Sequence, residues 1–142
     1  RTRQVPRKDW QRRHRGNPGD HFTSQLCVEA RSDGRHLEAR DQMLERRCQE
    51  VIDRYELPAY AIGLGAKGCV IFAPEPIYEY RDYLTKVDGE LSTLAWLYHM
   101  NHGIFMTPGV EEEWTLSIAH EQEHIDRYVA AFEAFASDVS SG

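Results

Sequence analysis

Apolar residues recur at helical spacing in three stretches of this 142-residue chain. The first begins at His36 and ends before Pro58, with Glu and Arg on its opposite face. The second covers residues 88–101, and Gly103 behind it suits a left-handed C-terminal cap. The third covers residues 121–136. The pattern therefore predicts three amphipathic helices.

Each expected helix has its own apolar face. The first presents Leu37, Leu44, Cys48, Val51, Ile52 and Tyr55. The second presents Leu91, Leu94, Ala95, Leu97 and Tyr98. The third is expected to bury Ile125, Tyr128, Val129, Phe132 and Phe135.

Short runs rich in β-branched and aromatic residues separate these helices and predict strands near residues 60–62, 69–73, 104–106 and 114–118. Helices and short strands in this order predict an α+β fold, with a small, mostly antiparallel sheet of three to four strands and about three helices packed on one face. Residues 1–36 mix Arg, Pro, Gly and Ser with few apolar side chains. They predict an irregular, basic leader before a domain over residues 37–142.

Charge, hydropathy and cysteine content argue against a nucleic-acid-binding, membrane-spanning or disulfide-rich protein. Residues 1–20 carry seven Lys or Arg against two Asp or Glu, and the remainder carries ten against twenty-one. The basic tail has Trp10 as its one aromatic residue and no binding motif, so nucleic acid is not an expected partner. No apolar run approaches the roughly 20 residues that span a bilayer. Three widely spaced cysteines, Cys27, Cys48 and Cys69, predict neither a disulfide framework nor a metal cluster. We expect a cytoplasmic protein with no membrane contact.

One glycine motif matches the dinucleotide fingerprint G-x-G-x-x-G, at Gly63-Leu64-Gly65-Ala66-Lys67-Gly68. That chemistry needs the last glycine on a helix whose N-terminus faces a pyrophosphate. Here the glycines lead into Cys69-Val70-Ile71-Phe72, which favours a strand. The interpretation we prefer is a link between two strands.

A second motif, His120-Glu121-Gln122-Glu123-His124, matches the zinc-peptidase pattern H-E-x-x-H. Such a site needs both imidazoles one turn apart on a helix, together with a third ligand. His120 lies where the expected helix begins, and no downstream ligand occurs at the usual spacing. We therefore expect no bound metal. A small zinc-dependent hydrolase that uses His120 and His124 stays an alternative, and a stand-alone interaction module is another.

Lysine is needed for chemistry that passes through a Schiff base, and this chain has Lys8, Lys67 and Lys86. The first lies in the basic leader, the second in the glycine link and the third in a polar turn. None is expected in a cofactor pocket, so each is interpreted as a solvent-exposed lysine.

Four strings of residues carry a family resemblance. They are Leu44-Glu45-Arg46-Arg47 running on to Leu57-Pro58; Gly65-Ala66-Lys67-Gly68-Cys69-Val70-Ile71-Phe72; His102-Gly103-Ile104-Phe105-Met106-Thr107-Pro108; and Leu116-Ser117-Ile118-Ala119-His120 followed by Ile125-Asp126-Arg127. The last three are similar to G-S-x-x-x-x-x-F, to R-G-V-Y-L-A-P, and to L-S-L-A-H with D-I-D-R. From about His36 to Ser137 the chain thus resembles the C-terminal small domain of class III pyridoxal-phosphate aminotransferases, above all glutamate semialdehyde aminomutases and β-amino-acid aminotransferases.

The resemblance implies a domain that shapes and closes the active site of an aminotransferase or aminomutase. Its partner would be the large domain, in cis or in trans, which holds pyridoxal phosphate on a lysine. This chain alone is expected to bind no cofactor and to be inactive, as a fragment that self-associates into a homo-oligomer. The resemblance places Glu112 at an acidic position that faces the active site, where the run Glu111-Glu112-Glu113 would favour an amine over a carboxylate. The alternative is a solvated acidic turn.

Overall fold

The structure, a computed structural model, describes the backbone of residues 21–107 and 113–142 and the side chains of residues 34–107 and 113–142. The chain divides into two compact units, residues 1–32 and 33–142. In the first unit the described residues form the start of helix α2 (His21–Tyr55). The expected irregular structure is therefore wrong for residues 21–36. The basic residues 1–20 lie outside the described part of the chain.

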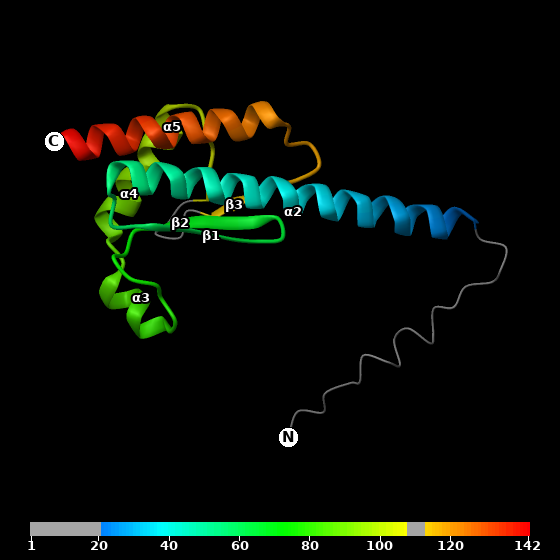
Figure 1. The fold of residues 1–142 in the computed structure, drawn as a ribbon, viewed down its shortest axis with the longest axis horizontal. Coiled ribbons are helices and arrows are strands. Elements are labelled where there is room, and N and C mark those ends of the chain that lie inside the picture. The colour runs from blue at the N-terminus through cyan, green and yellow to red at the C-terminus, as the bar shows by residue number, and fades with distance from the viewer. Residues whose placement is uncertain (1–20, 108–112) are drawn as a thin grey trace, which may run out of the picture. The chain divides into compact units, whose positions relative to one another are not determined.

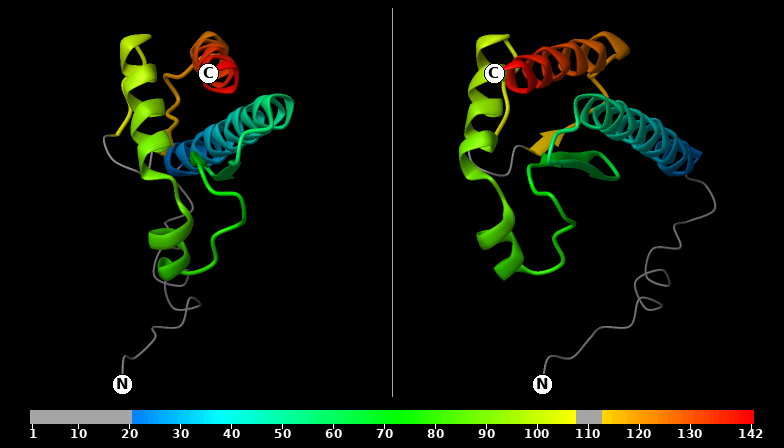
Figure 2. Two further views of the ribbon diagram at one scale, coloured as in Figure 1. Left: turned by 90° about the vertical axis from the view of Figure 1, so that its left-hand side faces the viewer. Right: turned by 60° about the vertical axis from the view of Figure 1, so that its left-hand side comes forward.

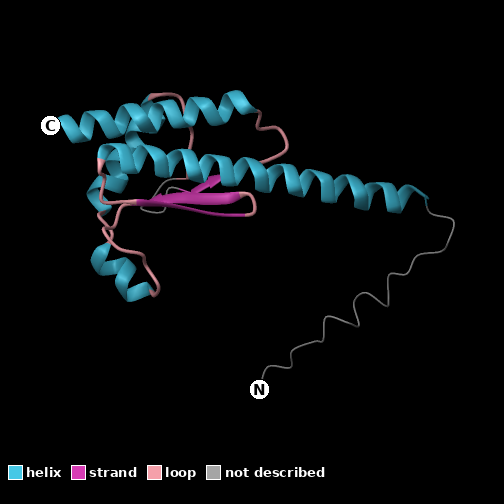
Figure 3. Cartoon of the chain, in the orientation of Figure 1, coloured by secondary structure: helices cyan, strands magenta, loops and turns pink. Residues whose placement is uncertain are grey.

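The second unit contains the rest of α2 and six further elements, drawn in Figure 1 and coloured by type in Figure 3. In chain order these are β1 (Tyr60–Leu64), β2 (Lys67–Ile71), α3 (Tyr80–Lys86), α4 (Gly89–Asn101), β3 (Glu113–Thr115) and α5 (Gln122–Ser141). This confirms the predicted α+β class. The short helix α3 was not expected.

The sheet has three strands in the order β1-β2-β3, and both pairings are antiparallel. A two-residue turn joins β1 to β2 in a hairpin, and Gly68 of β2 lies opposite Trp114 of β3. A Cβ atom on Gly68 would stand 2.4 Å from the Trp114 ring and 2.5 Å from the carbonyl oxygen of Ile62. Glycine at this position therefore leaves room for the indole against the hairpin.

Within the second unit, residues 33–55 of α2 run beside α5 in all three ribbon views (Figures 1 and 2), on the face of the sheet that carries Val70 and Trp114. Arg47 and Arg54 of α2 form ion pairs with Asp126 and Glu133 of α5. The two pairs are seven residues apart along each helix, so the helices are parallel. The core between helices and sheet includes all five α5 side chains that the sequence predicted, and from α2 Leu44, Cys48, Val51 and Ile52.

Helix α4 begins where the sequence predicted, because the Asp88 side chain accepts hydrogen bonds from the backbone N–H groups of Glu90 and Leu91. Its buried face differs from the prediction. The buried residues of α4 are Ser92, Ala95 and His99, whereas Leu94 and Leu97 are about half exposed. The predicted apolar stripe of this helix is therefore wrong at both leucines.

The predicted strand at residues 104–106 is absent from the described residues. Gly103 has a φ of 73°, as expected for a left-handed cap, and the Ile104 N–H bonds back to the His99 carbonyl at 2.9 Å. The Met106 carbonyl accepts a hydrogen bond from the Trp96 indole at 3.3 Å. Helix α4 thus takes the backbone groups that a strand would have offered to the sheet.

Within the described residues, every helix is too short or too polar to serve as a bilayer span.

Candidate functional site

A pocket of about 330 Å³ lies within the second unit, at the start of α5. Its walls come from residues 103–107 behind α4, from residues 113–116 in and after β3, and from the first turns of α5, with Leu44 of α2. Trp114, Met106 and Leu116 are buried and give the pocket an apolar floor. Its polar lining includes His120, His124, Arg127 and Glu113. It therefore combines apolar surface with a few converging polar groups, as small-molecule sites do.

Both histidines of the sequence motif line this pocket, but they are held in a way that differs from a zinc peptidase. The Nδ1 atom of His120 accepts a hydrogen bond from the Ser117 backbone N–H at 3.0 Å, and the Ser117 hydroxyl lies 2.9 Å from it. The Nδ1 atom of His124 accepts from the Glu121 backbone N–H at 2.9 Å. The rings meet edge to face with centroids 5.8 Å apart.

The zinc-peptidase motif requires both histidines to lie on one helix, and in this structure they do not. Helix α5 begins at Gln122, with Glu121 as its N-cap, so His120 precedes the helix. Glu121 takes part in a capping box, in which its side chain accepts from the backbone of His124. No group of three or more His, Cys, Asp or Glu side chains that could hold a metal occurs in the described part of the chain. Nothing in the structure or among the relatives below supports the hydrolase alternative.

Arg127 reaches the pocket from the second turn of α5. Its Nη2 donates to the carbonyl oxygen of His102 at 3.2 Å. A Cβ atom on Gly103 would stand 2.6 Å from that nitrogen, so the glycine leaves room for the guanidinium. No carboxylate of a described residue lies within ion-pair distance of Arg127. Sequence reasoning noted this residue only as part of a family string, because its role depends on the turn after α4.

Glu113 is the described member of the acidic run. It is the first residue of β3, lines the pocket, and lies 3.7 Å from the Lys67 ammonium of the neighbouring strand. Glu112, the substrate-proximal candidate, and Glu111 lie outside the described residues.

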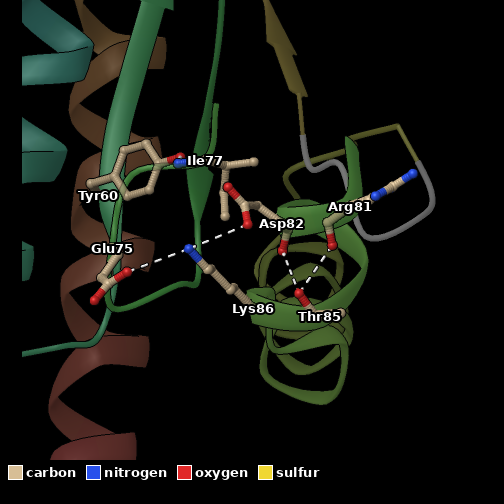
Figure 4. A network of polar contacts seen from close by, with 7 residues as sticks. All are labelled: Tyr60, Glu75, Ile77, Arg81, Asp82, Thr85 and Lys86. Atoms are coloured by element: carbon tan, nitrogen blue, oxygen red, sulfur yellow. Dashed lines mark hydrogen bonds and ion pairs between the residues drawn. The ribbon is translucent and has the colours of Figure 1, made fainter. Parts of the chain in front are cut away.

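The described lysines do not fit a cofactor that must be held as a Schiff base. Lys67 is 65% exposed and pairs with Glu113. Lys86, at the end of α3, lies 3.4 Å from both Glu75 and Asp82 (Figure 4). The hydrogen bond to Asp82 raises the pKa of Lys86 further, which disfavours the neutral amine that a Schiff base needs. Lys8 lies outside the described residues.

The glycine motif is a hairpin. Gly63 belongs to β1, Gly65 and Ala66 form the turn, and Gly68 belongs to β2. Gly65 has a φ of 75°. The motif leads directly into strand β2 and not into a helix, so the preferred interpretation as a link between strands is confirmed.

Two buried polar residues were missed by sequence reasoning. Asp41 of α2 is buried beside Trp114, and burial raises the pKa of its carboxyl group, while the hydrogen bond from Trp114 opposes that rise. His99 of α4 is buried between α4 and α5, where its ring stacks on Tyr128 at 4.8 Å. Burial lowers the pKa of His99. A polar residue inside a helical pattern gives no signal of burial by itself.

The chain matches no family model. Its sequence is similar to glutamate-1-semialdehyde 2,1-aminomutases. The protein of that name from Geotalea daltonii is 27% identical over 99 residues, which are 70% of this chain and 23% of the relative. Glutamate-1-semialdehyde 2,1-aminomutase 2 from Geobacillus thermodenitrificans is 32% identical over 123 residues, or 83% of this chain and 28% of the relative. The chain spans about a quarter of the length of the curated relatives it matches.

Solved structures show the same fold. A glutamate-1-semialdehyde aminomutase from Pseudomonas aeruginosa PAO1, in complex with PMP, superposes with a TM-score of 0.70 at 17% identity, covering 75% of this chain and 23% of that one. A β-phenylalanine aminotransferase from Variovorax paradoxus superposes with a TM-score of 0.67 at 24% identity, covering 75% and 24%. Over about 70% of its residues, this chain is thus homologous to one part of the class III aminotransferase family, to which the aminomutases and transaminases above belong.

Proposed function

We propose that this chain is the domain that shapes and closes the active site of a pyridoxal-phosphate-dependent aminotransferase or aminomutase, and that it is inactive alone. The observation that carries the proposal is the match to about a quarter of each relative. The remaining three quarters of such a protein would hold the cofactor. Pyridoxal phosphate, when bound to a lysine, supplies the electron sink for amino-group chemistry.

The lysine chemistry of this chain supports a cofactor held elsewhere. Both described lysines are engaged by carboxylates at the surface, and neither lines the pocket at the start of α5. The contribution of this chain would be the pocket walls. Trp114, Met106 and Leu116 would exclude water from a bound substrate, while His120 and His124 would present polar groups to it.

An exposed apolar surface on α3 and α4 supports a partner domain. Leu84 of α3 is 63% exposed, and Leu94 and Leu97 of α4 are 50% and 46% exposed. Helix α3 directly precedes α4, and both lie at one end of the sheet (Figure 2). Apolar patches of this kind mark sites of protein association. We propose the cofactor-binding large domain as the occupant, and self-association into a homo-oligomer when that domain is absent. A cytoplasmic location is part of the same proposal.

Glu112 stays the proposed substrate-proximal residue. It precedes Glu113, which lines the pocket. A second carboxylate at this place would favour an amine over a carboxylate in the substrate. In a protein that contains both domains, Glu112→Gln should change the ratio of kcat/KM between an amine substrate and an amino acid of equal length, with Glu75→Gln as control. An unchanged ratio would make Glu112 a solvated turn residue.

Cofactor retention tests whether this chain holds pyridoxal phosphate by itself. The purified 142-residue chain is incubated with pyridoxal phosphate, dialysed, and examined for the absorbance of lysine-bound cofactor. We expect no stoichiometric retention, and the same result for Lys67→Ala and Lys86→Ala. Retention of one cofactor per chain that either substitution abolishes would show that this chain holds the cofactor itself, and the proposal would be wrong.

A further inference from the structure

Two histidine side chains hold the turn that leads into helix α5. The Nδ1 atom of His120 accepts the Ser117 N–H at 3.0 Å, and the Nδ1 atom of His124 accepts the Glu121 N–H at 2.9 Å. A backbone N–H can only donate, so each Nδ1 must be unprotonated. A charged imidazole has no acceptor left, because both of its ring nitrogens carry a proton. Both bonds therefore exist only while the rings are neutral.

His124 stands where a capping box usually has Glu or Gln. Its ring accepts the N–H of Glu121, the N-cap residue, while the Glu121 side chain accepts the N–H of His124. A Gln amide accepts at any pH, and a Glu carboxylate accepts down to about pH 4. Histidine is the side chain that ordinarily changes its charge between about pH 5 and pH 8. Mild acid therefore removes half of this capping box, whereas a box with Gln or Glu would survive.

The two histidine bonds differ in what replaces them. The Ser117 hydroxyl lies 2.9 Å from Nδ1 of His120, and its oxygen can accept from that nitrogen once the nitrogen is protonated. The His120 N–H also bonds to the Ser117 carbonyl at 3.0 Å, which does not depend on the ring. In the described part of the chain, the ring of His124 has Glu121 as its one hydrogen-bond partner. Acid therefore acts mainly on the bond between Glu121 and His124.

The elements packed around the two rings carry few charges. Besides the histidines, the titratable and charged residues of the pocket lining are Glu113 of β3 and Arg127 and Tyr128 of α5. Glu113 already lies 3.7 Å from the Lys67 ammonium. The lining from α2 is the apolar Leu44, and the lining from residues 103–107 has no titratable side chain.

The carboxylates of the first turn of α5 do not pair with the rings either. The Glu121 carboxylate is engaged by the backbone of His124, and Glu123 is next to His124 in the helix, where neighbouring side chains do not face each other. No described carboxylate forms an ion pair with His120 or His124. A proton on His124 thus places a positive charge at the N-terminus of a helix, where the helix dipole disfavours it.

The effect of losing the box is local. Residues 121–124 are exposed, whereas Ile125 is 1% exposed and anchors the helix in the core. Asp126 forms an ion pair with Arg47 of α2, and Tyr128 is buried. The helix can therefore fray only before Ile125. Because His120 and His124 line the pocket, fraying moves this part of the pocket wall.

We propose that residues 117–124 are an acid-sensitive switch. Neutral His120 and His124 hold this segment against the pocket, and protonation of His124 releases the first turn of α5 and opens the pocket wall. Neither cofactor nor partner domain takes part, so the switch is separate from the function proposed above.

An NMR titration of the ¹⁵N,¹³C-labelled 142-residue chain from about pH 7.5 to about pH 5 tests the switch. At the upper pH both rings should show the Nε2–H tautomer. As the His124 ring becomes protonated, the Glu121 amide proton should shift with the same midpoint. Its protection from solvent exchange, corrected for the intrinsic rate, should fall by about fivefold or more. The Ser117 amide should lose less protection.

Opening of the pocket is measured in the same titration. Leu116 lines the pocket and is 7% exposed. A soluble paramagnetic probe should broaden its methyl resonances more strongly below the midpoint than above it. Unchanged broadening while the Glu121 amide responds would mean that the turn frays without opening the wall, and would contradict the proposal.

Three variants assign the response to a ring. His124→Asn places an amide oxygen close to the position of Nδ1 and cannot titrate, so the Glu121 amide should keep its protection throughout. His120→Asn should do the same for the Ser117 amide and leave the Glu121 response as in the wild type. His36→Asn removes an exposed histidine of α2 outside the pocket lining and should change neither amide.

Two outcomes at the Glu121 amide would overturn the switch. If the His124 ring becomes protonated while this amide keeps its shift and protection, the ring does not hold the N–H. If the response persists unchanged in His124→Asn, another group causes it. Should His124→Asn fail to fold, the wild type still decides, because different midpoints for ring and amide would exclude the link. Since the chain is studied without cofactor, each result leaves the proposed aminotransferase function to its own tests.

Discussion

The indole nitrogen of Trp114 in β3 donates a 2.7 Å hydrogen bond to the carboxylate of Asp41, a residue of α2 that is 1% exposed. This contact joins the last strand to the first described helix across 73 positions of sequence. A Cβ atom on Gly63 would stand 2.5 Å from the other carboxylate oxygen of Asp41, so the hairpin also closes over the group. Asp41 thus joins the sheet to α2. This arrangement buries an acidic group, which disfavours its charged form.

The first prediction concerns the charge on Asp41. Burial raises the pKa of this carboxyl group in the folded chain above its value in the unfolded chain. The folded chain therefore binds more protons than the unfolded chain between the two pKa values, and stability falls as pH rises through them. Asp41→Asn keeps an acceptor for Trp114 without the charge. Its free energy of unfolding, relative to the wild type, should therefore rise from about pH 4 to about pH 7.

The matched control removes the acceptor instead. Asp41→Ala leaves the Trp114 N–H buried without a partner, which costs about 1–3 kcal/mol. Urea unfolding of both variants across the pH range measures the two effects. A difference between Asp41→Asn and the wild type that does not change with pH would contradict the predicted direction of the pKa shift.

The second prediction concerns the packing of the hairpin. Gly68→Ala places a methyl group within 2.5 Å of both the Trp114 ring and the Ile62 carbonyl. Overpacking of this kind costs about 1–3 kcal/mol. Gly34→Ala is the control, because a Cβ atom there has no neighbour within 4 Å and alanine favours a helix by up to about 1 kcal/mol. Equal stabilities of the two variants in thermal unfolding would refute this account of the Gly68 contact.

The third prediction concerns His99. Its Nδ1 donates to the Ala95 carbonyl at 2.8 Å, its ring stacks on Tyr128, and burial lowers its pKa. A histidine with a lowered folded pKa is protonated first in the unfolded chain. Stability is therefore full above the ordinary value of about 6.5 and falls as pH decreases toward the folded pKa.

His99→Phe keeps an aromatic ring at this position and cannot titrate. Its unfolding free energy should therefore fall less than that of the wild type between about pH 7.5 and about pH 5. Thr93→Val changes an exposed residue of the same helix without removing a titratable group, and serves as the control, for which we expect the wild-type slope. If His99→Phe and the wild type lose stability in parallel, the burial of His99 does not govern the acid response.

The sequence predicted some elements well for a clear physical reason. In α5 the apolar residues fall on one face and charged residues on the other, so periodicity alone identified five of the seven buried residues, and the two it left out are alanines. In α4 apolar residues occur on every side, and the buried face contains Ser92 and His99. Periodicity cannot show which side of such a helix packs inward.

The site shows the same difference between local and tertiary information. Gly103 was identified as a cap because a left-handed cap has a local signature. The strand expected at residues 104–106 depended on partners, and α4 supplied those partners instead. The position of Arg127 beside the pocket follows from the turn at Gly103, which brings together residues 25 positions apart. Sequence patterns do not show such contacts.

The central claim is that this chain supplies one domain of an aminotransferase. The most direct measurement is amino-group transfer by a chimera in which residues 37–142 replace the matching part of the Geobacillus thermodenitrificans aminomutase. We predict that the chimera retains its cofactor and transfers amino groups faster than the same enzyme without that part. A folded, cofactor-loaded chimera that is no faster than the truncated enzyme would contradict the account.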